Sequence, residues 1–592
     1  MMTPAHLLAP SVEEMRELSA VALGEDEADL VLVGGDVVDV YSGEILNDYA
    51  VAIKGKRIAF VGPDAGHAIG PQTEVIDLSG RFLVPGFIDA HTHLIYYYSP
   101  AEFLRYAMVD GTTCIVTETM EIAFPLGYRG IKAYLEAIRD QPIKIFATAP
   151  PMASVVPSSS PLLKPEELEG LLREGDLLGL GEGYWQEVLR NEGFLEMFVE
   201  TLKSGRRIEG HSAGAKGRKL AAYLACGISS CHEPIDAEEV LERLRQGVHV
   251  MIREGSIRRE LEAAAPVKDA GVDLRRLILV SDGLEPGDAM KGHLGPVVRK
   301  AVALGFDPIE AIQMVTLNPA EHFRLDEFIG GIAPGRFADI AVFPDLEEFQ
   351  AAMVLSNGRI IVREGELVVQ PRRHTFPGWT GESVHLSPLR PEDFIILIPA
   401  SPSGRIRVRA IEMVTQLVTR KVEVEVEALD GRVRSDPSRD LLKVAAIERG
   451  ERPGRRFIGL VKGFGLKQGA FASTFAWDCS DVIVLGVDEL DMALAVDRII
   501  ELGGGVVICA EGEVLAEVPL PIGGVISDSP MEELAAGFAA IQERASELGV
   551  PFPNAHLALI TLTSPAIPFF RISNRGLIDI KENRLLDLEV TP

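Results

Sequence analysis

The sequence predicts an α/β fold: a (β/α)8 TIM-like barrel with a flanking small β-sandwich domain and an additional C-terminal α+β domain. One observation is a long central region in which apolar, strand-like runs alternate with helix-like segments, which is the pattern of a parallel sheet covered by helices. Another is the short alternating runs with Gly and Asp turns on both sides of that region, which indicate antiparallel strands. At 592 residues the chain is also too long for one ordinary domain.

The elements are expected in the following order along the chain. A short amphipathic helix over about residues 11–22 precedes short strands over residues 29–80, and the strand–helix units follow. Short strands then return, and a Pro-, Gly- and Arg-rich stretch forms the expected linker. The expected limits are residues 1–84 for the N-terminal helix and first part of the sandwich, 85–335 for the barrel, 336–375 for the second part of the sandwich, 376–395 for the linker, and 396–592 for the C-terminal domain.

Composition and charge exclude some classes of partner. Lys and Arg number 58 against 87 Asp and Glu, a formal net charge of −29, and a chain this acidic repels nucleic acids and anionic membranes. Five scattered cysteines without a CxxC pair are typical of reduced thiols in the cytoplasm. We find no signal-peptide pattern and no apolar run near the roughly 20 residues of a membrane span. The sequence therefore predicts a soluble, cytoplasmic protein.

The first candidate site lies in "VPGFIDAHTHLIYYYSP", residues 84–100. Residues i and i+2 of a strand point to the same face, so His91 and His93 can both face the mouth of a barrel. Taken alone, two histidines at this spacing are more often structural or surface residues than metal ligands. Their position before the strand–helix repeats favours a metal site, because polar residues at the ends of barrel strands are typically catalytic.

Four further candidates stand at the ends of later strands, and they are Glu182, His211, His232 and Asp282. Together with the two histidines they provide the six nitrogen and oxygen ligands that a two-metal site needs. Asp282 would contact one metal ion and also accept and deliver protons. The sequence therefore predicts a metal-dependent barrel.

Each of these residues also has an alternative structural interpretation. Glu182 could cap a helix, His211 could lie in a turn, and Asp282 could begin an Asx turn before a glycine. Glu233 could shuttle a proton or hold a substrate, and it could equally pair with Arg253. Each structural alternative is plausible for one residue. That all of these residues, at successive strand ends, have only structural roles is the less economical interpretation, so the constellation favours the metal site.

The motifs resemble a known family. "PGFIDAHTH", the aspartate of the eighth strand and "TLNPAEHFRLDEFIGGIAPGRFADIAVF" resemble the amidohydrolase superfamily. "LLGLGEG", "EGHSAGAKGRKLAAYLACGISSCHE", "VKGFGLKQGAFASTFAWD" and "EVLAEVPLPIGGVISD" are similar to the adenine deaminase family, nearly end to end. The resemblance implies a binuclear centre, usually of manganese or iron, bridged by Glu182. It also implies hydroxide attack at purine C6 with release of ammonia and formation of hypoxanthine, and a homodimer or larger homo-oligomer.

The chain departs from the family pattern near the site. Ile95 stands where the family has an acid, Met120 replaces a histidine beside the retained Glu121, and Trp477 replaces a histidine near the C-terminus. Polar groups are lost and aromatic ones gained, which favours a flat or apolar substrate; some of these aromatic residues could instead fill space in the core. The predicted substrate-binding residues are Tyr96, Tyr97, Met120, Glu121, Tyr184 and Trp185.

Three functions remain open at this point. The first is a hydrolytic deaminase that converts adenine and water to hypoxanthine and ammonia, or performs the same reaction on a related aminated heterocycle, with Asp282 and Glu233 as catalytic residues. The second is an amidohydrolase that cleaves a cyclic amide or another C–N bond of a larger, more apolar ring. The third is a catalytically silent binding protein, which retention of all six ligands disfavours. Imidazole and carboxylate ligands accept zinc, manganese and iron alike, so they do not identify the metal.

Overall fold

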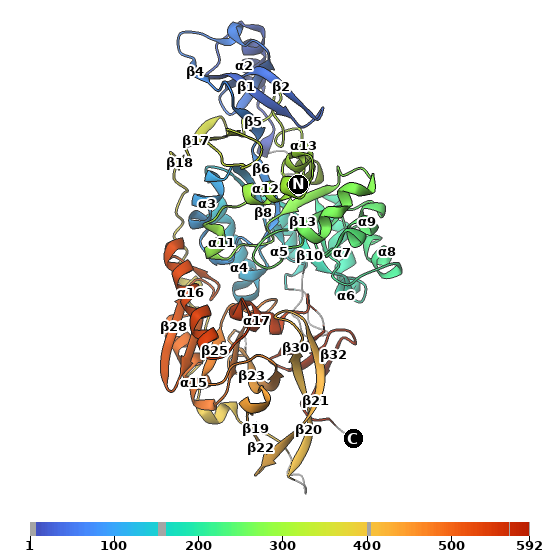
Figure 1. The fold of residues 1–592 in the computed structure, drawn as a ribbon, viewed down its shortest axis with the longest axis vertical. Helices are drawn as coiled ribbons and strands as arrows, with labels where there is room; N and C mark the ends of the chain where they lie inside the picture. The colour runs from blue at the N-terminus through green and yellow to red at the C-terminus, as the bar shows by residue number, and fades with distance from the viewer. Residues whose placement is uncertain (1–6, 152–161, 399–403, 451, 568, 591–592) are drawn as a thin grey trace.

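The computed structural model describes residues 7–151, 162–398, 404–450, 452–567 and 569–590. It is built of three parts that follow one another along the long axis of the molecule (Figure 1). The N-terminal sheet lies at one end, the strand–helix units lie in the middle, and the C-terminal domain lies at the other end. The candidate site residues lie in the middle part, on the side that faces the C-terminal domain.

The expected β-sandwich is one continuous sheet of nine strands assembled from both sides of the barrel segment. Its order is β18-β17-β16-β15-β5-β1-β2-β3, with β4 paired to β1. Apolar side chains alternate along β1, so that Leu30 and Leu32 join one buried cluster while Val31 joins the other, beside the N-terminal helix. The bounds are α2 Val12–Leu23, β1 Leu30–Asp39, β2 Glu44–Lys54, β3 Arg57–Gly62, β4 Glu74–Asp77, β5 Phe82–Pro85, β15 Ile340–Phe343, β16 Met353–Ser356, β17 Arg359–Arg363 and β18 Glu366–Leu367.

The central part contains eight parallel strands in chain order. Five form one hydrogen-bonded sheet and three form another. Ser229 N donates to Ile208 O at 2.9 Å, which joins the two sheets at one edge, and Asp282 N donates to His91 O at 3.2 Å at the other. The fold is therefore TIM-barrel-like. The strands are β6 Phe87–Thr92, β8 Thr112–Thr117, β9 Lys144–Ala149, β10 Leu177–Tyr184, β11 Arg207–His211, β12 Ser230–Cys231, β13 His249–Arg253 and β14 Leu277–Val280.

Helices follow the strands, as the sequence pattern predicts. α9 begins after Asp236, whose side chain accepts a hydrogen bond from Glu239 N, and it buries Val240 on its inner face. The helices are α3 Pro100–Val109, α4 Met120–Ile138, α5 Pro165–Leu172, α6 Trp185–Val188, α7 Glu192–Lys203, α8 Arg218–Leu224, α9 Ala237–Arg245, α10 Leu261–Ala264, α11 Pro286–Ala289, α12 Gly295–Ala303, α13 Pro308–Gln313 and α14 Leu317–Phe323. Among the described residues, no helix has the length and apolar composition that a membrane crossing requires.

The C-terminal domain has a ten-stranded sheet with its own core. Its order is β19-β22-β21-β20-β24-β23-β26-β25-β27-β28. Helix α15 begins at an Asp488 cap, ends at Gly503 in the left-handed conformation, and packs on the sheet. Leu386 and Phe394, from the expected linker, are buried in the same core. The bounds are β19 Ile396–Leu397, β20 Arg405–Met413, β21 Thr419–Leu429, β22 Arg432–Val433, β23 Leu441–Glu448, β24 Arg456–Lys462, β25 Ala470–Ser473, β26 Asp481–Gly486, α15 Glu489–Leu502, β27 Gly505–Ala510 and β28 Glu513–Pro519.

The last part of the chain returns to the barrel. Strand β7, Tyr97–Tyr98, pairs in parallel with β29, Ile526–Ser527, so the segment after the first strand of the barrel is hydrogen-bonded to the C-terminal domain. Three short antiparallel strands end the described chain. The remaining elements are α16 Met531–Glu547, α17 Ala555–Ile560, β30 Phe570–Ser573, β31 Gly576–Asp579 and β32 Arg584–Leu586.

Candidate metal centre

The six predicted ligands lie at or just beyond the carboxyl ends of parallel strands. The strands bring them together because neighbouring parallel strands end at the same edge. Each is at most 7% exposed, a degree of burial that charged groups avoid unless they are paired or bind metal. They are His91 and His93 at β6, Glu182 in β10, His211 at the end of β11, His232 after β12 and Asp282 after β14.

The ligand atoms fall into two groups that share one carboxylate. Glu182 belongs to both groups, and within each group the atoms lie within 4.8 Å of one another. Its Oε1 is 3.2 Å from His91 Nε2 and 3.0 Å from His232 Nε2, while its Oε2 is 3.2 Å from His211 Nδ1. Asp282 Oδ1 completes the first group at 3.3 Å from His91 Nε2. A carboxylate between two sets of imidazoles can bridge two cations.

The donor set fits divalent cations. His91 Nε2 and His232 Nε2 are buried, face the carboxylate of Glu182, and make no well-aligned hydrogen bond to any residue that the structure describes. A buried polar atom without a partner costs free energy unless another group, such as a metal ion, satisfies it. Imidazole nitrogens and carboxylate oxygens at this spacing are ligands for zinc, manganese or iron.

Two carboxylates contact the Nδ1 atoms of His91 and His93. Glu121, in the first turn of α4, forms a short hydrogen bond with His93 Nδ1, and its Oε1 makes the contact. Glu118, directly after β8, has its Oε1 3.6 Å from His91 Nδ1. Such carboxylates orient a ligating imidazole and raise its basicity. We did not identify Glu118 from the sequence, although it obeys the same rule as the other candidates, an acid at the end of a barrel strand.

The carboxylate of Glu233 contacts two histidines of the second group and does not pair with Arg253. Its Oε1 is 3.2 Å from His211 Nδ1 and 2.7 Å from His232 Nε2, and its Oε2 accepts a hydrogen bond of 2.6 Å from Ser212 N. Arg253, the suggested alternative partner, is held by Glu260 through two hydrogen bonds of 2.9 Å. The structure thus places Glu233 at the centre, where a proton carrier or substrate ligand is needed.

Burial raises the pKa of the carboxyls in the site, and neighbouring positive charges lower it. Burial disfavours the charged form of Glu182, but the imidazoles of His232 and His211 outweigh it and hold the pKa of this carboxyl well below its usual range. Burial likewise opposes ionisation of Asp282, whose pKa is nevertheless lowered by the Arg253 guanidinium. In Glu118 burial prevails and raises the pKa to about 7. The carboxyls of Glu182 and Asp282 thus favour the anionic form, which is the form that can bind a cation.

The predicted substrate-binding residues occupy three different places. Met120 and Glu121 line a narrow crevice between the barrel and the C-terminal domain. The ring of Tyr184 lies 4.6 Å from that of His211, with Met120 in the same apolar cluster. Trp185, the first residue of α6, is half-buried and donates from Nε1 to Ala213 O at 2.9 Å.

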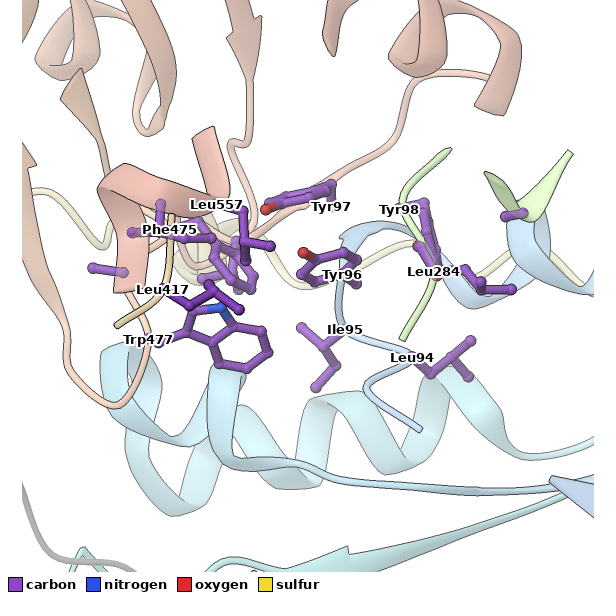
Figure 2. Close-up of a cluster of buried hydrophobic side chains, with 14 of the residues drawn as sticks. Leu94, Ile95, Tyr96, Tyr97, Tyr98, Leu284, Leu417, Phe475, Trp477 and Leu557 are labelled. Atoms are coloured by element: carbon purple, nitrogen blue, oxygen red, sulfur yellow. The ribbon is translucent and has the colours of Figure 1, made fainter. Parts of the chain in front are cut away.

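The tyrosines after the histidine pair lie at the domain junction. Figure 2 shows Tyr96 and Tyr97 directed toward Phe475 of the C-terminal domain, with Tyr98 turned away beside Leu284. The ring of Tyr97 lies 4.8 Å from that of Phe475, and its hydroxyl is 3.1 Å from His556 Nδ1. The Tyr98 hydroxyl donates to Leu284 O at 2.8 Å. All three tyrosine side chains are buried.

The C-terminal domain forms one wall of the crevice. Its contributions are Phe475, Ala476, Trp477, Asp478 and Val525, which face Met120, Glu121 and Phe124 of α4. The ring of Trp477 meets that of His93 edge to face at 5.0 Å. From the sequence we singled out Trp477 as a departure from the family pattern but assigned no residue beyond the barrel to the site, because the contact joins segments that are far apart along the chain.

Comparison with known proteins gives one family over nearly the whole chain. Residues 82–361 match the amidohydrolase family, and residues 416–584 match the adenine deaminase C-terminal domain. Proteins named adenine deaminase are similar from end to end: that of Moorella thermoacetica is 41% identical over 98% of both chains, that of Cenarchaeum symbiosum 36% identical over 97% of this chain and 95% of the relative, and that of Rubrobacter xylanophilus 38% identical over 97% of both. A solved structure of molinate hydrolase covers 57% of this chain and 95% of its own, at 17% identity and a TM-score of 0.43.

Relatives this similar over the full length, together with the matched C-terminal domain, settle the relationship that the sequence motifs indicated. The chain belongs to the adenine deaminase family of amidohydrolases.

Proposed function

We propose that the protein is a metal-dependent hydrolase that converts adenine and water to hypoxanthine and ammonia. The observation that carries this proposal is the pair of ligand groups that share Glu182, in a chain similar over its full length to proteins named adenine deaminase. A purely binding protein has little use for a buried hydrolytic centre. The relatives likewise do not favour cleavage of a cyclic amide.

We propose two divalent cations per chain, with manganese or iron as the family resemblance implies and zinc also compatible with the donors. One would be held by His91, His93 and Asp282, the other by His211 and His232, with Glu182 between them. Such cations lower the pKa of water so that it becomes a nucleophile at neutral pH, and they polarise the bond under attack. Glu118 and Glu121 would keep the first two imidazoles in the ligating orientation.

Asp282 is the proposed proton carrier. Its backbone has φ of 59°, in the left-handed region, and its Oδ1 lies 3.3 Å from His91 Nε2. Arg253 Nη1 lies 3.5 Å from its Oδ2, so one oxygen faces the ligands and the other is held by a guanidinium. From there Asp282 can accept the proton of the attacking water and deliver it to the leaving amine. Glu233, between His211 and His232, is proposed to hold the substrate edge or pass on a proton.

The proposed substrate contacts are supported to different degrees. Direct contact is supported for Met120 and Glu121 by their position in the lining of the crevice, and for Tyr184 by its ring contact with His211. Tyr96 stacks near Trp477 at 5.9 Å and would shape the same wall. The polar atoms of Tyr97 and Trp185 already make hydrogen bonds elsewhere. For these two residues we therefore propose an indirect effect on the substrate, through the residues that they contact.

The remaining proposals concern architecture and location. We propose that the eight strands close into a complete (β/α)8 barrel. The domain limits that we propose are those expected from the sequence, except that Leu386 and Phe394 of the expected linker belong to the core of the C-terminal domain. The five unpaired cysteines support a cytoplasmic location. The family resemblance supports a homodimer or larger homo-oligomer.

The decisive experiment is ammonia release from adenine by purified, manganese-loaded protein. Asp282→Asn is the test variant, and Asp288→Asn, which changes a nearby aspartate paired with Lys291, is the matched control. We expect release by the wild type and the control, and none by Asp282→Asn. If the metal-loaded wild type releases no ammonia but opens a cyclic amide to a new carboxylate, the second function replaces the first.

A further inference from the structure

A buried carboxylate outside the metal centre reaches the crevice from the C-terminal domain. Asp478 is only 3% exposed, and its carboxyl oxygens are each held by one hydroxyl. Tyr184 donates to Oδ1 at 2.7 Å, and Ser564 donates to Oδ2 in a short hydrogen bond. Tyr184 stands two residues after Glu182, so the carboxylate is tied to the strand that carries the shared metal ligand.

The backbone holds Asp478 in one orientation. Its φ is 63°, in the left-handed region, which costs a residue with a side chain of order 1 kcal/mol or more unless the surroundings fix it. The preceding residue fixes it, because Trp477 N donates to Ile560 O at 3.2 Å and Trp477 O accepts from Thr563 Oγ1 at 2.8 Å. The strained position therefore belongs to a rigid wall and not to a mobile turn.

The opposite wall of the crevice carries an unsatisfied acceptor. Glu121 is 6% exposed, and its Oε1 is engaged by His93. Its Oε2 is buried and has no hydrogen-bond partner in the part of the chain that the structure describes. A carboxylate oxygen has two acceptor sites, so each oxygen of Asp478 also keeps one after its hydroxyl bond. The crevice thus presents acceptors from both domains, between apolar faces such as Phe124 and Val525. Its polar groups suit the N–H donors on the edges of a flat ring. The free volume of the crevice is about 10 Å³, which is room for one water molecule, so the two walls must move apart to admit such a ring.

The chemistry of a free aminopurine limits which donors can meet these acceptors. Its amino group must lie at the metal centre, because that is where it leaves. The one other N–H of the molecule is on the imidazole ring. A nucleoside carries a sugar at that nitrogen and has no N–H there.

We propose that Asp478 is a specificity-determining residue that accepts a hydrogen bond from the imidazole-ring N–H of the substrate, so that the C-terminal domain selects the free base against N9-substituted purines. This inference rests on the proposed deaminase function. Burial raises the pKa of the Asp478 carboxyl to about 6, which leaves it ionised at neutral pH and able to accept. Sites that read a polar group with a buried partner discriminate strongly against analogues that lack that group.

The test compares Asp478→Asn with the wild type, both as full-length, metal-loaded protein. Asn keeps an acceptor for Tyr184 but presents an amide N–H₂ in place of the second acceptor. Ser564→Ala is the matched control, because it removes a hydroxyl bond to the same carboxylate and leaves the carboxylate in place. Metal content and ammonia release from adenine are measured first for all three proteins, followed by calorimetric affinities for purine and 9-methylpurine, which have no amino group to release.

We expect the wild type and Ser564→Ala to prefer purine over 9-methylpurine by at least about 10-fold, and Asp478→Asn to reduce that preference to about twofold or less. Asp478→Asn should also lower kcat/KM for adenine by about 100-fold at unchanged metal content. The inference is overturned if the wild type shows no preference, binds neither ligand, or keeps its preference in the variant. A wild type that releases no ammonia overturns the proposed function as well, whereas an active wild type with an unaltered variant overturns the inference alone.

Discussion

Tyr97 and His556, 459 residues apart in the chain, share a hydrogen bond of 3.1 Å between the tyrosine hydroxyl and Nδ1. His556 is fully enclosed, and burial lowers its pKa to about 3, so the imidazole is neutral. Its other nitrogen is 3.0 Å from Ser473 Oγ. The pair therefore joins the loop after the first barrel strand to the core of the C-terminal domain, close to the ligand His93.

Tyr97→Phe tests whether this hydroxyl holds the domains together or contacts the substrate. We expect a loss of about 1–3 kcal/mol of stability, because the substitution leaves His556 Nδ1 buried without a partner, and we expect kcat/KM for adenine to stay within about threefold. Thermal unfolding and ammonia release measure the two effects. Tyr98→Phe is the neighbouring control, since its hydroxyl bonds to Leu284 on the barrel side. An unchanged melting temperature with a 30-fold or larger loss of kcat/KM would instead place the Tyr97 hydroxyl on the substrate.

The stability of the same junction should depend on pH through Glu285. Asn554 of the C-terminal domain donates a short hydrogen bond to Glu285 Oε1, and Ser256, Arg259 and Asp288 lie nearby. Burial raises the pKa of Glu285 from 4.5 to about 7. Because the folded pKa lies above the unfolded one, the stabilisation by the protonated form is complete below pH 4.5 and is lost as pH rises to 7. At higher pH the buried charge costs roughly 3 kcal/mol.

Glu285→Gln removes this titration and keeps an acceptor for Asn554. We expect the variant to melt a few degrees higher than the wild type at pH 8, with a much smaller difference at pH 5. Melting curves of the metal-loaded proteins at the two pH values give the comparison. Equal shifts at both pH values would mean that the carboxyl does not titrate in this range.

Much of the site was predictable because its residues obey a local rule. Glu182, His211 and His232 each stand at the end of an apolar run, so their position at strand ends predicted that their side chains lie together, as they do. Glu118 obeys the same rule but was not predicted. The family motif after this strand has its histidine at position 120, so the prediction named Met120 and Glu121 instead. The strand–helix alternation likewise predicted the central fold, since it depends on local sequence.

The contacts between domains were not predictable in the same way. Tyr184 and Asp478 are hydrogen-bonded although they are 294 residues apart in the chain. Nothing in the sequence around either residue predicts that the other is its partner. The place of the tyrosines after the histidine pair was not predictable either, because aromatic composition does not say which side of a loop faces a second domain. The position of these tyrosines depends on the parallel pairing of β7 with β29, which joins segments that are far apart in the chain.

A glycine in β10 should be essential to the carboxylate behind His91. A Cβ on Gly181 would lie 1.9 Å from Glu118 Oε2, so the side chain of Glu118 would have to move. We expect Gly181→Ala to cost about 1–3 kcal/mol of stability through overpacking and to weaken metal affinity by about 10- to 100-fold, the usual effect of disturbing such a carboxylate. Gly287→Ala is the control, because no atom of the residues that the structure describes lies within 4 Å of a Cβ built there. Metal titration followed by spectrometry decides; unaltered affinity in Gly181→Ala would show that Glu118 does not support the ligand.

Glu182→Gln should separate the shared-ligand arrangement from two independent sites. The amide keeps the shape of the side chain but is neutral and presents a donor to one set of imidazoles, so it can satisfy at most one of the two ligand groups. We expect the purified variant to lose at least one ion per chain and its deaminase activity to fall more than about 1000-fold, since the centre supplies several kcal/mol of transition-state stabilisation. Glu187→Gln, five residues along in α6, changes an acid outside the ligand groups and should retain both properties. Added manganese should raise the melting temperature of metal-depleted wild type, because an ion that binds only the folded state stabilises it, and should do so much less for Glu182→Gln. A variant that kept its full metal content and half its activity would show that the two groups bind their ions without the bridge.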